Sequence, residues 1–228
     1  MTAHAPTRPG VRPWALSGTA LVAVGVLAVL GLHVVAVDVD PLRRTLSQYA
    51  LGPWKPVFDA GVLAAAAGSA AVLAGLVRAG LVPLRGAAVA LLAAWSACLV
   101  VVVAFEKIDW SVGPTPTGYV HRYASLVAFF CLPAAALALS RAWRGDARWG
   151  ALARATWWLG VASLGWLVPI LLGFVLRPLT GVPWWQFVPL GIMERGLALT
   201  EVAVVVALAI WAGSRSARVE AGAALSAR

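Results

Sequence analysis

VDVDPLRRTLSQYALGPWKPVFDAG, residues 37–61, is a polar stretch in a chain that is otherwise almost entirely apolar. We call it the polar segment. Asp40 followed by Pro41 is typical of a helix N-cap and first turn, and Gly52-Pro53 is a helix stop. The polar segment therefore predicts a short helix over about residues 41–51. Its apolar and polar side chains would lie on opposite sides, as in a helix at a membrane interface.

The composition places the rest of the chain in a lipid bilayer. Of 228 residues, 61% are hydrophobic and 12% are charged, too much apolar surface for one soluble core. The net charge is +9, but the basic residues are scattered between apolar runs, which argues against nucleic-acid binding. Cys98 and Cys131 fall inside these runs, where a free cysteine behaves as a small hydrophobic residue.

Six apolar runs have about the 20 residues that a spanning helix needs. They cover about residues 14–37, 57–77, 86–105, 123–140, 155–176 and 190–212. The first run is longer than the roughly 7 to 15 apolar residues of a signal peptide, so we favour an uncleaved span over cleavage after Ala36. The fifth run is expected to kink at Pro169.

These runs predict an all-α integral membrane bundle of six transmembrane helices, with a short interfacial helix after the first span. The expected organisation is a tail at 1–13, a membrane domain at 14–212 and a tail at 213–228. In the second run, Gly61, Gly68 and Gly75 recur every seven residues, which predicts a smooth stripe that another helix approaches closely.

Loop charges predict the orientation of the bundle. One set of loops and tails holds eleven basic residues against two acidic ones, and the other set, counted with the adjoining span ends, holds seven against seven. Since basic residues are retained in the cytoplasm, we expect a multi-pass plasma-membrane protein with both termini cytoplasmic and the polar segment outside. Tryptophans near the expected inner ends are Trp14, Trp143, Trp149 and Trp211, and those near the outer ends are Trp54, Trp110, Trp184 and Trp185.

Ionisable residues inside a span are costly and are candidates for function. Glu201 falls about midway along the sixth run, and Glu194 lies seven residues earlier on the same helix face. The pair could line a polar passage or cavity. Alternatively, Glu201 is protonated or paired with an arginine, and serves only packing.

His33 and His121 are expected at the same depth as several acidic residues, and so are weak candidates for a metal site. Zinc bound by these histidines and an acid such as Asp109 is one hypothesis, and haem ligation by the two histidines is another. The sequence contains no HExxH motif and no His-rich ligand set. No cofactor is therefore predicted.

The outer loops also suggest catalysis or ligand binding. Ser47 as nucleophile, His121 as base and Asp109 as orienting acid would suit a hydrolase, although no GxSxG motif supports it. Basic side chains that suit a phosphate or carboxylate head group are Arg43, Arg44, Arg122, Arg177 and Arg195. Equal numbers of carboxylates on this face are expected to neutralise them.

Four stretches resemble the bacterial and archaeal membrane proteins grouped as domain of unknown function 998. They are DPLRRTLSQY (40–49), FDAG (58–61), IDWSVGPTPTGYVHR (108–122) and GIMERG (191–196). The resemblance covers about residues 14–212 and implies a multi-pass membrane architecture without an agreed activity. It implies that Ser47, Phe58, His121 and Arg195 stand where the family tends to place similar groups. Asp59 departs from the asparagine expected there.

The first hypothesis is therefore a membrane protein of unknown activity with an outward-facing polar cavity or lid, formed by residues 38–59, the 106–122 loop and the start of the sixth span. The lid would bind a lipid head group or small ligand through residues such as Arg43, Arg122, Glu194, Arg195 and Glu201, or support a partner protein in the envelope. The alternatives are a membrane-embedded hydrolase and a small transporter that uses Glu201. An enzyme is the less favoured reading. The bilayer is the expected partner, and a membrane protein or a second copy of the chain (a homo-oligomer) is the alternative partner.

Overall fold

The computed structural model describes residues 11–109, 111–181 and 188–226. The described residues form helices and no strand, which confirms the all-α prediction. The elements are α1 (Val11–Val35), η1 (Leu46–Leu51), α2 (Lys55–Arg78), α3 (Ala87–Ala104), α4 (Pro116–Trp143), α5 (Gly150–Gly165), α6 (Val168–Thr180) and α7 (Leu190–Ser226). Six stretches in the described residues are long and apolar enough to cross a membrane, with α5 and α6 counted as one.

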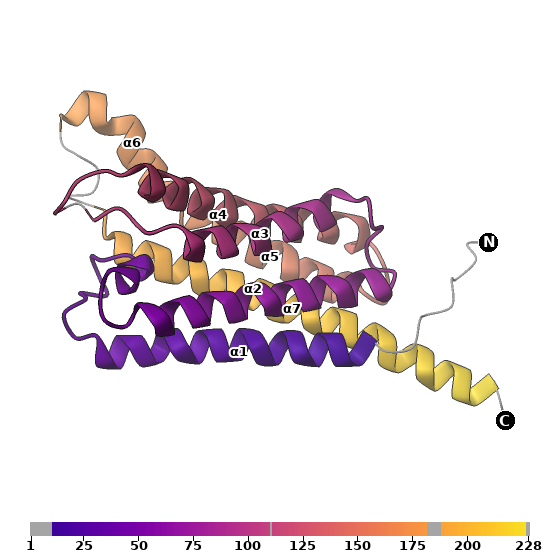
Figure 1. The fold of residues 1–228 in the computed structure, drawn as a ribbon. Coiled ribbons are helices and arrows are strands. Elements are labelled where there is room, and N and C mark those ends of the chain that lie inside the picture. Colours follow the sequence, from indigo (N-terminus) through magenta and orange to yellow (C-terminus); the bar gives the residue numbers. More distant parts are fainter. Residues whose placement is uncertain (1–10, 110, 182–187, 227–228) are drawn as a thin grey trace.

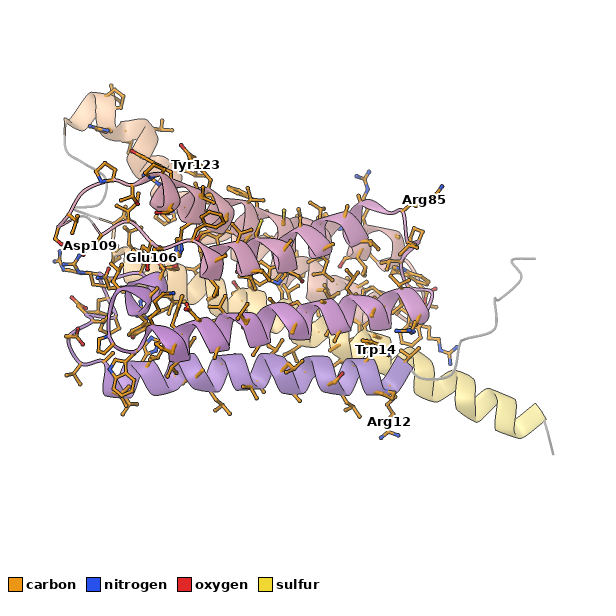
Figure 2. The ribbon with its side chains drawn as sticks, viewed as in Figure 1. Arg12, Trp14, Arg85, Glu106, Asp109 and Tyr123 are labelled. Atoms are coloured by element: carbon orange, nitrogen blue, oxygen red, sulfur yellow. The ribbon has the colours of Figure 1, made fainter. Side chains whose placement is uncertain are left out.

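The long helices run side by side, and the start of α1 and the far end of α7 lie at the same end of the bundle (Figure 1). Figure 2 shows Glu106 and Asp109 at one end, and Arg12, Trp14 and Arg85 at the other. We refer to these as the Asp109 end and the Arg85 end. The polar segment and η1 lie at the Asp109 end.

Glycines bring α1 and α2 into close contact. A Cβ atom built on Gly68 of α2 would lie 2.7 Å from the backbone oxygen of Gly18 in α1, and one on Gly25 would lie 2.6 Å from the oxygen of Gly61. No side chain fits at these distances, so the backbones themselves are in contact. The predicted glycine stripe is confirmed, and its partner helix is α1.

The fifth span is broken where the sequence predicts a kink. Helix α5 ends at Gly165, and α6 begins at Val168, directly before Pro169. Proline has no N–H for the helical ladder and its ring clashes with the preceding turn. As a result, α6 turns away from the axis of the bundle (Figure 1).

The short helix after α1 is smaller than predicted. Asp40 caps a turn rather than a helix: its Oδ1 accepts from the N–H of Leu42, and its backbone oxygen accepts from Arg44. Thr45 is then extended, and a 3₁₀ helix covers only Leu46–Leu51. The first part of the expected helix is a turn because the backbone oxygen of Leu42 accepts a hydrogen bond from Ile192 in α7.

Two tryptophans differ from the predicted belt. Trp149 and Trp211 are 7% and 0% exposed, so they belong to the packed core near the Arg85 end rather than to a lipid-facing ring. Trp14 and Trp54 are both 39% exposed, as a belt requires. The predicted positions Trp110, Trp184 and Trp185 lie outside the described residues, as do residues 1–10 of the expected N-terminal tail. The expected C-terminal tail continues α7 as helix to Ser226.

Candidate functional site

Arg195, in the second turn of α7, is the centre of a hydrogen-bond network at the Asp109 end. Its Nε donates to Nε2 of His33 in α1 at 2.6 Å. Nη1 donates to the backbone oxygens of Arg44 at 2.7 Å and Gly191 at 3.1 Å, and Nη2 donates to the Tyr49 hydroxyl at 3.4 Å. One guanidinium therefore holds α1, the polar segment and α7 together.

The start of α7 makes further contacts with the backbone of the polar segment. Glu194 Oε2 accepts from the N–H of Leu46 at 2.7 Å, at the first residue of η1. A Cβ on Gly191 would collide with the backbone of Pro41 and lie 2.8 Å from the oxygen of Arg44. Glycine is thus required at 191 for the turn to lie directly on α7.

Lys107, in the loop after α3, ties a third part of the chain to this assembly. Its Nζ donates to Thr45 Oγ1 at 2.7 Å and to Gln48 Oε1 at 3.0 Å. Burial lowers the pKa of Lys107 to about 8, and the nearby charge of Glu194 opposes that change. The polar segment, the loop between α3 and α4 and the start of α7 therefore meet at one place.

The apolar side of η1 is buried below these polar contacts. Tyr49 is 2% exposed and packs with Leu32, Ala36 and Phe58. A small pocket of about 80 Å³ opens beside this cluster, between the end of α1, η1 and the start of α2. Its lining is Ala36, Asp38, Val39, Gln48, Tyr49, Leu51, Gly52, Pro53 and Trp54.

The expected ion pair with a carboxylate is not found for Arg195 among the described residues, where its hydrogen-bond partners are a histidine, a hydroxyl and backbone oxygens. The neighbouring carboxylate of Glu194 still interacts with its charge. Arg43 and Arg122 are exposed. Asp59 pairs with Lys55, four residues earlier, at 2.6 Å. An aspartate at this position therefore serves an ion pair at the start of α2.

Ser47, Asp109 and His121 each have different hydrogen-bond partners. Ser47 Oγ lies 3.2 Å from Thr45 Oγ1, and Asp109 accepts from the N–H and hydroxyl of Ser111, which lowers the pKa of the Asp109 carboxyl. His121 is buried, and its Nδ1 lies 2.9 Å from the backbone oxygens of both Val102 and Phe105. The hydrogen bonds described for these residues do not form a nucleophile–base–acid chain.

The two histidines also have different hydrogen-bond partners. His33 bonds to Arg195, and His121 bonds to backbone oxygens at the end of α3. Among the described residues, no group of three or more His, Cys, Asp or Glu side chains has a metal-binding arrangement. The zinc hypothesis therefore has no supporting geometry in that part of the chain. His121 serves instead to hold α4 against the irregular end of α3.

Glu201 is 1% exposed within α7, and its Oε1 is buried without a hydrogen-bond partner among the described residues. The arginine partner considered from the sequence is thus not found there. Nearby on α7, Thr200 Oγ1 accepts from Ser163 Oγ of α5 at 2.9 Å. Glu201 and the Arg195 network therefore occupy different levels of the same helix.

Sequence reasoning missed Lys107 and Gly191 as members of this assembly. One signal for Lys107 was available, because it is one of two lysines in the chain and lies two residues after the end of an apolar run. Gly191 begins the GIMERG stretch, but its contact was not predictable, since its requirement arises from the backbone of the polar segment, 147 to 150 positions earlier in the chain.

Six apolar spans and a polar cap at one end define a multi-pass α-helical membrane protein. Residues 19–211 match the family model described as Protein of unknown function (DUF998), and the chain belongs to that family. The resemblance seen in the four sequence motifs is thereby confirmed. Comparison with curated proteins and with solved structures finds no significant match.

Proposed function

We propose that the assembly at the Asp109 end is a lid that binds the head group of a membrane lipid. The observation that carries this proposal is the pocket of about 80 Å³ beside Tyr49, at the end of two spanning helices. A group bound there would lie near the level of lipid head groups. The network of Arg195, Glu194 and Lys107 supports the proposal because it preorganises the pocket wall at η1.

The chemistry of the lining favours an ammonium group over a phosphate. Asp38 supplies a carboxylate, Gln48 an amide, and Tyr49 and Trp54 aromatic rings, whereas no lysine or arginine lines the pocket. Carboxylates and aromatic faces are the groups that attract alkylammonium ions. The volume has room for a few water molecules, which matches a small head group such as ethanolamine.

The test is competition between lipids on the purified full-length chain. Phosphatidylethanolamine and phosphatidylglycerol are supplied in equal amounts, and the lipid retained is identified by native mass spectrometry. We expect preferential retention of phosphatidylethanolamine. Asp38→Asn should reduce this preference about tenfold, the effect of losing roughly 1.4 kcal/mol from a charge-assisted contact.

Arg43→Gln is the matched control, because Arg43 is exposed in the same segment but does not line the pocket. It should leave the preference unchanged. Equal retention of both lipids by the unmodified chain would reject head-group binding at this pocket. Preference for phosphatidylglycerol would support a head-group site but reject the proposal that the site binds an ammonium group.

A membrane hydrolase is not proposed, because Ser47, Asp109 and His121 bond to other partners. A small transporter is the second candidate, favoured by the buried carboxyl of Glu201 in a spanning helix. Its test is proton or cation flux in proteoliposomes of the full chain. Flux that persists unchanged in Glu201→Gln would reject this use of Glu201.

A further inference from the structure

We infer that Glu201 is a proton-binding site in the interior of the bundle. Glu201 lies eleven residues after the start of α7, a depth of about 16 Å at 1.5 Å per residue. Its side chain is 1% exposed, and Oε1 has no hydrogen-bond donor among the described residues. This inference is independent of head-group binding at the Asp109 end.

The surroundings of Glu201 on α7 are apolar. Leu197 and Val204, one turn before and almost one turn after it, are 1% and 0% exposed. The polar neighbours Thr200 and Ser163 bond to one another, and Thr200 also donates to the backbone oxygen of Leu197. Their described hydrogen bonds therefore leave Oε1 of Glu201 without a donor.

Charged groups on the elements packed against α7 have other described partners or lie at the ends of the bundle. His33 of α1 and Arg195 of α7 bond to each other, and Lys55 of α2 pairs with Asp59. His121 of α4 is held by backbone oxygens at the end of α3, and Arg154 of α5 donates to the backbone oxygen of Arg144. Glu194, on α7 itself, accepts from Leu46 of the polar segment.

A carboxylate without a counter-charge or donor is too costly to bury in a spanning helix. A bound proton neutralises the carboxylate and needs almost no additional volume. A single carboxyl group is enough to bind it. A multivalent metal ion would need several ligands, and no group of three candidate ligands is found in the described residues. The proton is therefore the ligand that fits Glu201.

The experiment is infrared spectroscopy of the full chain in lipid at pH 7, with the carbonyl stretch of protonated carboxylic acids as the readout. The measurement uses Glu194→Gln as the parent, so that the other acid in the spanning part of α7 does not contribute. We expect such a band in Glu194→Gln, and we expect it to disappear when Glu201→Gln is added. Glu106→Gln, which removes an exposed acid, is the control and should retain the band.

A spectrum of Glu194→Gln without the band, or a band that survives the added Glu201→Gln, would overturn the inference. If Glu201→Gln does not fold, carbon-13 labelling of glutamate in the triple variant Glu106→Gln, Glu194→Gln, Glu220→Gln, where Glu201 is the one glutamate left in the sequence, identifies the carbonyl by its isotope shift. A shift of the band upholds the proton site, and no shift rejects it. A band without flux in the proteoliposome experiment would reject transport and leave the proton site in place.

Discussion

Arg195 of α7 donates from Nε to Nε2 of His33 in α1 across 2.6 Å, although the two residues are 162 positions apart in the chain. An arginine is always a donor, so Nε2 of His33 must be the acceptor. The other ring nitrogen, Nδ1, lies 2.7 Å from the backbone oxygen of Val29 and must carry the proton. The two partners together define one neutral tautomer of His33.

The first prediction is that Arg195→Gln destabilises the protein by about 2 to 4 kcal/mol. The change removes donors to His33, Tyr49 and the backbone oxygen of Arg44, and leaves partly buried acceptors unpaired. Thermal unfolding in a fixed detergent measures the effect. Arg122→Gln removes an exposed arginine and should be nearly neutral. Equal losses in the two variants would contradict the central role of Arg195.

The second prediction concerns the contact between α1 and α2. Gly68→Ala places a methyl group 2.7 Å from the backbone oxygen of Gly18, so the helices must separate, at a cost of about 1 to 3 kcal/mol. Gly31→Ala is the control, because a Cβ at Gly31 of α1 meets nothing within 4 Å. A lower unfolding temperature is expected for Gly68→Ala only. Equal unfolding temperatures would show that the backbone contact is not needed.

The spans were predictable because an apolar run of sufficient length has few alternatives to a membrane helix. The glycine stripe was predictable for a similar local reason, since Gly61, Gly68 and Gly75 lie on one face of one helix. Proline chemistry likewise placed the break before Pro169. Each of these features depends on residues within one span.

The candidate site was predictable only in outline. The sequence indicated that the polar segment, the 106–122 loop and the start of the sixth span would meet, but it paired the arginines with carboxylates. In the structure, the turn at 40–44 leaves backbone oxygens outside any helix, and Arg195 satisfies the oxygen of Arg44. Such a partner cannot be read from charge counts, because every residue carries the same backbone oxygen.

A third prediction follows from the lowered pKa of Lys107. With a pKa of about 8, roughly one in ten Lys107 side chains is neutral and nucleophilic at pH 7. Acetylation by an amine-reactive reagent, located by mass spectrometry, should therefore rise with a midpoint near pH 8. Lys107→Arg, which removes the reactive amine, is the control for the location of the label. A profile of Lys107 without a midpoint near pH 8 would contradict the effect of burial.

Lys107 also gives the sign of a stability change with pH. The folded state releases this proton near pH 8, whereas the unfolded chain releases it near 10.5. The unfolded state therefore binds more protons between these values, and the contribution of Lys107 to stability rises with pH. From pH 7 to 10, the unfolding midpoint of the unmodified chain should therefore rise relative to that of Lys107→Met. A constant difference would reject the assigned pKa.

The last prediction tests the orientation expected from loop charge. Arg43 and Arg85 are both exposed and lie at opposite ends of the bundle, so cysteines there are accessible to a membrane-impermeant maleimide. With Cys98 and Cys131 replaced by alanine, Arg43→Cys should be labelled from outside intact cells, and Arg85→Cys only after lysis. The physical reason is the retention of arginine-rich loops in the cytoplasm. Labelling of Arg85→Cys in intact cells, with Arg43→Cys protected, would reverse the orientation and place the Asp109 end in the cytoplasm.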